Sequence, residues 1–376
     1  MTNPVGAAAA APSFTARPSA ARSALLGVMF LAAFVTTCVL LRRSLPFPEV
    51  PVVRAKLGHL ARHGDEYDVL FVGSSRVQFQ VMPVVFDHVS GENGVPVKSF
   101  NAGVAGMGSP EDAYLLEEIL RRPHARLRWV FVELSRLGTG LDREATARFS
   151  YWHDATRLEL IARRLWGQAS EEQAKLERNQ AAAFGARYEI WSTMADKLSG
   201  HGWHWLRRSV NLGAGTRTVD FWQRTRADRR HGERDLGDHR DGWVSAGHDH
   251  QQMGPEARLK YEQSYAERML KPAGKERGDE VSRAALEQLV ATITQAGAVP
   301  ILVIPPTTFD QNFFPTEERE RELEIFDFTD VRENAELFAP DRRIDVDHVN
   351  TAGAELFSTA LARRFVELVK QTTKTP

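Results

Sequence analysis

Apolar residues form short continuous runs near both ends of the chain, and amphipathic stretches separate these runs. Runs typical of buried strands occupy residues 69–72, 97–100, 129–134 and 299–304. Patterns typical of helices occupy residues 82–89, 281–295 and 351–369, and the serine, proline and two acids at 109–112 favour the start of another helix. Apolar strands that alternate with helices predict an α/β fold, a three-layer sandwich whose mostly parallel sheet has helices on both faces.

The alternation of strands and helices stops between residues 138 and 277. This stretch is dense in charge, helical in composition and rich in tryptophan. It predicts a helical insertion that leaves the sheet at the end of the third strand. Ligands bind at the carboxyl ends of the strands in open α/β sheets, so we expect the insertion to cover the site. Its tryptophans either form a core of their own or stack on sugar rings.

The N-terminal part divides by composition into three segments. Residues 1–23 are rich in alanine, proline and serine and predict a disordered tail. Residues 24–42 predict a transmembrane anchor, because about 18 uncharged residues approach the minimum that crosses a bilayer as a helix. Residues 43–56 contain several prolines and predict a linker to a domain at 57–376.

A cleaved signal peptide is the alternative to the anchor, since Arg17 and Arg22 precede the apolar run. However, the run is longer than a normal signal-peptide core and ends without a small-residue cleavage site. The orientation stays open at this point. The basic residues that follow the run outnumber those before it, which by the positive-inside rule would keep the large domain in the cytoplasm.

Composition narrows the function classes. The chain has 376 residues, 43% of them hydrophobic, and a formal net charge of -1, so a sizeable core is possible and no global field attracts nucleic acid. The single cysteine, Cys38, falls inside the apolar N-terminal run. No disulfide can form within the chain, so cysteine usage does not indicate a compartment.

Two motifs at opposite ends of the chain carry residue types that act together in serine catalysis. Gly73-Ser74-Ser75-Arg76 follows the first apolar run, and Asp345-Val346-Asp347-His348 precedes the last predicted helix. A serine is a weak nucleophile at neutral pH unless a base accepts its proton. An imidazole serves best as that base when a carboxylate fixes its tautomer and orientation. The motifs therefore predict the parts of a hydrolytic or acyl-transfer site.

Three motifs resemble the first, second and fifth sequence blocks of the SGNH (GDSL-type) hydrolases. They are Gly73-Ser74-Ser75, Asn101-Ala102-Gly103-Val104-Ala105-Gly106 and Asp345-Val346-Asp347-His348-Val349-Asn350-Thr351-Ala352-Gly353. They occur in the family's order, and the resemblance spans residues 67–134 and 281–370. Membrane-anchored members used for cell-envelope acyl transfer look most similar, such as the D-alanyl transfer protein of teichoic acids and the alginate acetylation proteins.

The resemblance implies an SGNH/flavodoxin-like fold and gives each matching residue a role. Ser75 would be the nucleophile, His348 its general base and Asp345 the group that orients the imidazole. The backbone amides of Ser75 and Gly106 would line the oxyanion hole, where a glycine lets the backbone approach the acyl oxygen. No metal or organic cofactor is implied. The large domain would lie outside the cytoplasm, where a membrane acyltransferase is a possible partner.

The third sequence block departs from the family pattern. The family has Gly-x-Asn-Asp there, and the asparagine side chain donates a further hydrogen bond to the oxyanion. This chain has Leu137 where that asparagine would fall. Loss of one such donor typically costs about 10²–10³ in rate. We therefore expect Ser135 or Arg136 to face the pocket as a substitute, or the activity to be weak.

Other polar residues are weaker candidates. Arg76 beside the nucleophile could hold an anionic substrate group, although an arginine in a first helical turn is more often solvated, and Asn101 is another possible substrate contact. His248-Asp249-His250 has metal-ligating residue types, but no partner cluster at a recognisable spacing accompanies it. We therefore expect no metal site.

The motifs and the resemblance together lead to one expected function and one alternative. The expected function is serine-dependent ester hydrolysis or O-acyl transfer on an acylated cell-envelope glycan or a similar polymer, by a single-pass membrane protein. The alternative is a membrane-tethered binding or scaffold protein that keeps the fold without turnover, which Leu137 would explain.

Overall fold

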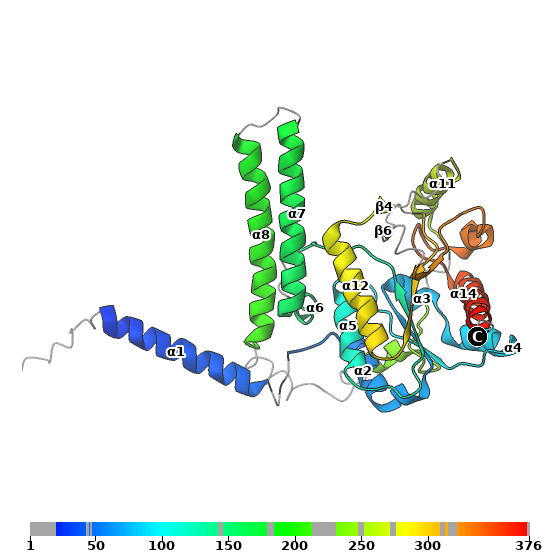
Figure 1. The fold of residues 1–376 in the computed structure, drawn as a ribbon, viewed down its shortest axis with the longest axis horizontal. Coiled ribbons are helices and arrows are strands. Elements are labelled where there is room, and N and C mark those ends of the chain that lie inside the picture. Colours follow the sequence, from blue (N-terminus) through cyan, green and yellow to red (C-terminus); the bar gives the residue numbers. More distant parts are fainter. Residues whose placement is uncertain are drawn as a thin grey trace, which may run out of the picture.

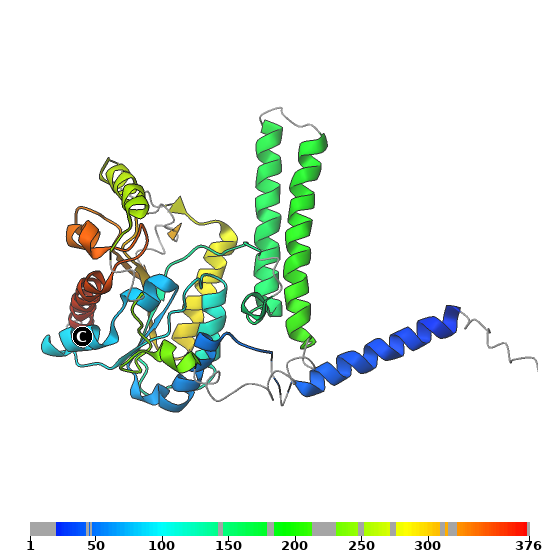
Figure 2. The same cartoon turned by 180° about the vertical axis from the view of Figure 1, so that it is seen from behind.

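The computed structural model describes residues 20–42, 45, 47–141, 146–178, 184–212, 231–246, 252–270, 276–308, 313–314 and 322–373. These residues form a parallel sheet with helices on both faces, a long helical hairpin and a separate N-terminal helix (Figures 1 and 2). The α/β class and the parallel sheet predicted from the sequence are confirmed.

The sheet has five strands, which are β1 (Val69–Val72), β2 (Ser99–Asn101), β3 (Trp129–Glu133), β5 (Val299–Ile304) and β7 (Glu324–Asp327). They lie in the order β2-β1-β3-β5-β7, and each neighbouring pair is parallel. After β1 the chain forms β2 along one side of β1, and it later forms β3 along the other side. This makes β1 the topological switch point, and ligands bind beside the carboxyl end of such a strand.

Helices cover both faces of the sheet. One face carries α2 (Pro51–His63), α5 (Glu111–Leu120) and α12 (Glu280–Gln295), and the other carries α3 (Ser75–Gln80), α4 (Pro83–Glu92) and α14 (Thr351–Thr372). Strand side chains alternate between the faces, so Leu70 and Val130 pack with the first group and Phe71 and Phe131 with the second. The sheet is therefore buried on both sides, which explains why its central strands are apolar throughout.

The insertion after β3 contains α6 (Ala147–Ser150), α7 (Ala155–Arg178), α8 (Phe184–Ser209), the short helix η2 (His231–Leu236), α11 (Pro255–Leu270) and strand β4 (Glu276–Arg277). Most of its described residues are helical, but its long hairpin lies elsewhere than over the expected edge. Helices α7 and α8 form a hairpin that stands beside α5 and α12 and does not lie across the carboxyl edge (Figures 1 and 2).

Other parts of the insertion approach the carboxyl edge. The backbone amide of Asn101 donates to the carbonyl of Asp241 at 2.7 Å, and the indole of Trp243 donates to the carbonyl of Phe79 at 2.9 Å. Trp152 is buried at the base of the hairpin, as a tryptophan of a structural core would be. The remaining elements are β6 (Phe313–Phe314), which pairs with β4, and the short helices η1 (Gly64–Glu66), η3 (Ala335–Phe338) and η4 (Pro340–Arg342).

Two boundaries predicted from the sequence need correction, and one strand was missed. The linker predicted at 43–56 is too long, because α2 already begins at Pro51 and buries Val53 and Lys56. The helix predicted from residue 109 begins at Glu111, and its cap residue is Pro110, which makes no side-chain capping bond. Strand β7 has no counterpart in the prediction, since only one of its four residues is buried and it lacks an apolar run.

The N-terminal helix α1 (Ala20–Leu41) begins four residues before the predicted anchor, and the rest of the predicted tail lies outside the described residues. Helix α1 is long and apolar enough to cross a bilayer, and almost all of its side chains are exposed. Its end contacts the hairpin through Asn211, whose side-chain amide donates to the carbonyls of Leu45 at 2.9 Å and Cys38 at 3.4 Å.

Candidate active site

Ser75 lies directly after β1, at the carboxyl edge of the sheet. Ser74 is the N-cap of α3, and its hydroxyl accepts a hydrogen bond from the amide of Arg76 at 3.2 Å. A Cβ on Gly73 would lie 2.6 Å from the Cβ of Glu133, so the turn between strand and helix requires glycine. Ser75 therefore becomes the first residue of α3, at the switch point of the sheet.

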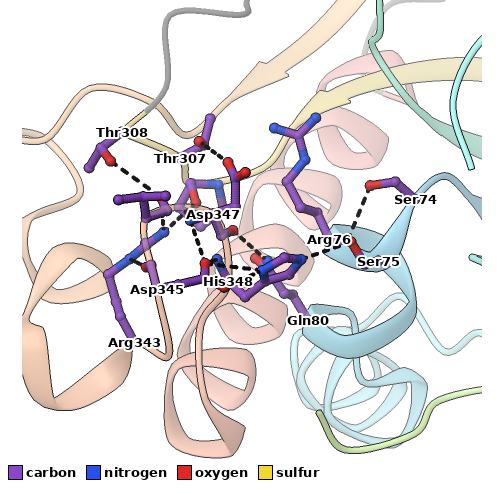
Figure 3. A network of polar contacts seen from close by, with 12 residues as sticks. Ser74, Ser75, Arg76, Gln80, Thr307, Thr308, Arg343, Asp345, Asp347 and His348 are labelled. Carbon is purple, nitrogen blue, oxygen red and sulfur yellow. Dashed lines mark hydrogen bonds and ion pairs between the residues drawn. The ribbon is translucent and has the colours of Figure 1, made fainter. Parts of the chain in front are cut away.

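Ser75, His348 and Asp345 converge, although they come from opposite ends of the chain (Figure 3). The Oγ atom of Ser75 lies 2.8 Å from Nε2 of His348. The Nδ1 atom of His348 lies 2.9 and 3.0 Å from the two carboxylate oxygens of Asp345. The side chains of His348 and Asp345 are 25% and 40% exposed, so a substrate can reach the group. This is the order of contacts in a Ser-His-Asp triad.

The loop that carries His348 is held from within. One oxygen of Asp345 accepts the backbone amides of Asp347 and His348, each at 2.7 Å. The fully buried guanidinium of Arg343 donates to the carbonyls of Asp345 at 3.2 Å and Val346 at 2.9 Å (Figure 3). These bonds fix the carboxylate and the imidazole relative to each other.

Neighbouring elements hold the same loop from outside. Thr307, which follows β5, donates to the Asp347 carboxylate at 2.6 Å, and Gln80 of α3 donates to the Asp347 carbonyl at 2.9 Å. Asn350 begins α14 as its N-cap, accepting the amide of Gly353 at 3.0 Å. The histidine loop is thus joined directly to the helix that begins with the serine.

The charge of Asp345 is favoured by its contacts. Burial raises the pKa of this carboxyl group. The hydrogen bonds and charge of His348 and the backbone amides outweigh burial, and they hold the pKa of Asp345 below its ordinary value. An ionised carboxylate at this position would stabilise an imidazolium if His348 accepted a proton.

Glu133 at the end of β3 holds the serine turn. This carboxylate is 3% exposed and accepts the amide of Ser74 at 2.6 Å, its hydroxyl at 3.0 Å and Nε of Arg76 at 2.7 Å. Burial lowers the pKa of Arg76, but the charges of Glu133 and Asp347 raise it above its ordinary value. Arg76, a predicted substrate contact, is therefore paired with Glu133, and this pair helps to hold Ser75 in place.

The backbone amides predicted for the oxyanion hole are available. In the part of the chain that the structure describes, the amides of Ser75 and Gly106 have no hydrogen-bond partner. Gly106 follows Val104 in a tight turn that closes with a 3.0 Å bond from the amide of Met107 to the carbonyl of Val104. The φ angle of Gly106 is 71°, a conformation that a glycine adopts without strain.

Asn101, a predicted substrate contact, is an internal residue in the structure. It is fully buried, and its side-chain amide donates to the carbonyls of Val77 at 2.8 Å and Val81 at 2.7 Å. Its side-chain oxygen accepts the amide of Gly103 at 2.9 Å. A Cβ on Gly103 would lie 2.6 Å from the backbone nitrogen of Gln78. The prediction for Asn101 is therefore corrected, since the side chain joins the loop to α3 and has no surface for a substrate.

The third-block residues do not contact the triad in the structure. Leu137, in the place of the family's asparagine, is 2% exposed and offers no donor. The hydroxyl of Ser135 donates to Asp112 at 3.3 Å. Arg136 lies near Arg164, whose pKa is lowered by burial first and by the charge of Arg136 to a smaller extent. Among the described residues, neither Ser135 nor Arg136 makes a hydrogen bond to Ser75 or His348, so the structure does not show the expected substitute donor.

An open groove borders the triad on the side of α11. It has a volume of about 480 Å³ and is lined by Gly254, Pro255, Glu256, Ala257, Lys260, Asp345, Val346 and Asp347. The volume lies within the range of small-ligand sites. Charged side chains lie on both walls, from α11 and from the histidine loop, although most of the lining surface is apolar.

Three residues that support the site were missed by the sequence prediction. A single acidic residue ends the apolar run of β3, and that break in the pattern is a signal that could have found Glu133. Lys56 fell in the predicted linker and Arg148 in the insertion, and their contacts with the loop at 101–106 are distant in sequence. No local pattern indicates contacts of that kind.

Among the described residues, no group of three or more histidine, cysteine, aspartate or glutamate side chains is placed to hold a metal ion. His248-Asp249-His250, the one motif with metal-ligating residue types, lies outside the described residues.

Comparisons with models of protein families, with curated proteins and with solved structures found no match to this chain.

Proposed function

We propose that the protein is a membrane-anchored serine enzyme of the SGNH class, with the three-layer fold of that class. Its reaction is ester hydrolysis or O-acyl transfer on an acylated cell-envelope glycan or similar polymer. The observation that carries the proposal is the 2.8 Å distance between Oγ of Ser75 and Nε2 of His348. The contact between Nδ1 of His348 and the Asp345 carboxylate completes the group.

The chemistry follows from these contacts. Ser75 attacks the acyl carbonyl while Nε2 of His348 takes the hydroxyl proton. The amides of Ser75 and Gly106 stabilise the negative charge on the carbonyl oxygen. His348 then returns the proton to the leaving alcohol, which leaves an acyl group on Ser75. A sugar hydroxyl or a water molecule, deprotonated by His348, accepts that acyl group and restores the serine.

The substrate class and location rest on the motif resemblance and two structural features. The groove beside Asp345 has charged side chains on both walls, which supports a hydroxylated polymer as substrate. The helix α1 would tether the domain to the bilayer, with the domain outside the cytoplasm. A membrane acyltransferase that delivers the acyl group is the partner we propose for the transfer reaction.

A catalytically inactive scaffold is the second candidate, and Leu137 favours it. A buried leucine replaces the side-chain donor of the family's third block, and loss of such a donor typically costs about 10²–10³ in rate. A loss of this size slows a serine enzyme without abolishing it. Active enzyme therefore remains the first proposal.

Hydrolysis of p-nitrophenyl acetate by the full-length protein in detergent tests the proposal. We expect turnover by the wild type and background rates for Ser75→Ala, with both proteins equally folded by circular dichroism. Adding a chito-oligosaccharide and following acetyl groups by mass spectrometry separates transfer from hydrolysis. A folded wild type no faster than Ser75→Ala would refute the enzymatic function and favour the scaffold.

A further inference from the structure

The loop at residues 101–106, here called the oxyanion loop, carries the Gly106 amide of the proposed site. In a trans peptide the carbonyl and the next amide N–H point in opposite directions. Whatever holds the carbonyl of Ala105 therefore orients the amide of Gly106. Nη2 of Arg148 donates to that carbonyl at 3.2 Å. Arg148 is itself paired with Glu111 and contacts the hydroxyl of Tyr151 at 3.3 Å.

A second cation holds the other end of the oxyanion loop. Lys56 is fully buried, and its Nζ donates to the carbonyls of Asn101 at 2.9 Å, Gly103 at 2.6 Å and Gly242 at 2.8 Å. These carbonyls belong to the loop and to the segment of the insertion that packs against it. One lysine thus joins helix α2, the oxyanion loop and the insertion.

The three carbonyl acceptors around Lys56 favour its protonated form. A protonated amine has three N–H donors, which match three carbonyl oxygens, whereas a neutral amine would direct a lone pair at one of them. Burial lowers the pKa of Lys56 to about 7, and the charges of Asp235 and Asp241 oppose that change. The three carbonyls favour the ammonium form of Lys56, and burial disfavours it. Burying this charged group therefore costs the fold some stability.

The amides of the oxyanion loop are fixed on the opposite side. Ala102 donates to the carbonyl of Phe71 at 2.7 Å, and Val104 donates to the carbonyl of Gly73 at 2.9 Å. Both acceptors belong to the strand and turn that lead to Ser75. Lys56 and Arg148 therefore bind carbonyls of the loop, while β1 and the serine turn bind its amides. Gly106 lies at the end of the segment that is held on both sides.

We propose that Lys56 and Arg148 are positioning residues that orient the oxyanion loop, so that the Gly106 amide faces the acyl oxygen. This inference rests on the proposed function. It assigns the task to residues outside the motifs, one from α2, which follows the membrane anchor in the chain, and one from the helical insertion. We expect changes at either residue to destabilise the transition state more than they weaken substrate binding. The reason is that the Gly106 amide stabilises the negative charge that develops on the acyl oxygen only in the transition state.

The test compares Lys56→Met and Arg148→Met in the full-length protein with p-nitrophenyl acetate as the probe. We expect kcat to fall about 10- to 100-fold in each, with KM within about threefold of the wild-type value, since small misplacements cost about this much. Hydrogen exchange at residues 101–106 should accelerate in both variants, while exchange in β3 stays unchanged.

Matched controls use the same substitutions at exposed ion pairs. Lys98 pairs with Glu66, and Arg121 pairs with Glu118, both on the surface. Lys98→Met and Arg121→Met should keep the kcat of the wild type. A merely general loss of positive charge would lower kcat in the controls as well, and that result would contradict the proposal.

Lys56→Met leaves three buried carbonyls without a donor, so the variant could fail to fold. Arg148 is partly exposed, and Arg148→Met keeps the prediction testable. For Lys56, the ¹⁵Nζ resonance of the wild type should shift when a fluorophosphonate modifies the serine, and an unchanged resonance would overturn its role. Folded variants with wild-type kcat overturn the inference alone. A folded wild type without turnover or labelling overturns the proposed function itself.

Discussion

The carboxyl edge of the sheet and the histidine cluster at the base of the helical hairpin bury polar groups in opposite ways. At the edge, buried charges are paired or fully hydrogen-bonded, as with Glu133 beside Arg76 and with Lys56 beside its three carbonyls. The base of the hairpin instead buries imidazoles against each other, with Nε2 of His153 lying 2.9 Å from Nδ1 of His201. The edge depends on charges being present, and this histidine cluster depends on charges being absent.

This contrast indicates that the two regions should fail under different conditions. Burial lowers the pKa of His153 to about 2 and that of His201 to about 4, with neighbouring histidines as a smaller cause for both. At neutral pH these imidazoles are uncharged and can pack as rings. Variants of the edge should therefore change activity and leave the hairpin intact, whereas acid should open the hairpin first.

The largest expected effect follows from Asp345→Asn. An amide cannot hold the imidazole of His348 in the correct tautomer, so kcat for p-nitrophenyl acetate should fall about 10⁴-fold. Asp347→Asn is the matched control, because that carboxylate accepts from Thr307 and not from His348. Its kcat should fall less than about tenfold. Equal losses in the two variants would contradict the assigned role of Asp345.

Glu133→Gln should give the next largest effect. The amide leaves the charge of Arg76 unpaired in a buried place and loosens the serine turn, which should cost roughly 3 kcal/mol of unfolding free energy and about 10²-fold in kcat. Glu66→Gln, at an exposed pair with Lys98, is the control and should change neither quantity. Denaturant unfolding and turnover measure both. Full activity in Glu133→Gln would show that the serine turn keeps its conformation without the Glu133 carboxylate, and would contradict this role of Glu133.

The smallest effect is the pH response of the hairpin. The folded pKa of His201 lies below its ordinary 6.5, so the stability from its neutral form is complete above pH 6.5 and is lost as pH falls toward 4. At pH 5 the loss should be about 2 kcal/mol. This loss should appear as faster hydrogen exchange in α8 at pH 5 than at pH 7.5, after correction for the intrinsic exchange rates. His201→Asn should remove the share of His201 and leave that of His153, whose pKa is also lowered, so about half of the response should remain. His88→Gln, at an exposed histidine, should leave the whole response.

The same contrast explains how much the sequence could predict. Strands that are buried on both faces show as apolar runs, and Ser75 and Asp345-to-His348 lie in motifs at the ends of such elements. These parts of the fold and the site were predictable. Strand β7 escaped because one face alone of a short edge strand is buried, and such a strand has no apolar run.

Contacts between distant segments were not predictable. Lys56 reads as a charge in a proline-rich linker, yet it is fully buried under carbonyls that lie 45 to 186 residues away in the chain. The histidines at the hairpin base lie 48 residues apart, and nothing local marks them as partners. The substitute for the missing oxyanion donor was expected at Ser135 or Arg136 because these residues are near in sequence. The structure instead places Arg148, from the insertion, against the oxyanion loop.

Labelling with a fluorophosphonate probe, followed by peptide mass spectrometry, tests the central claim most directly. A working triad predicts that the folded wild-type protein carries the phosphonyl group on Ser75. Ser74→Ala should still be labelled, because Ser74 caps α3 and is not the proposed nucleophile. Ser75→Ala should remain unmodified. A folded wild type that resists the probe, or a phosphonyl group on any other residue, would contradict the account.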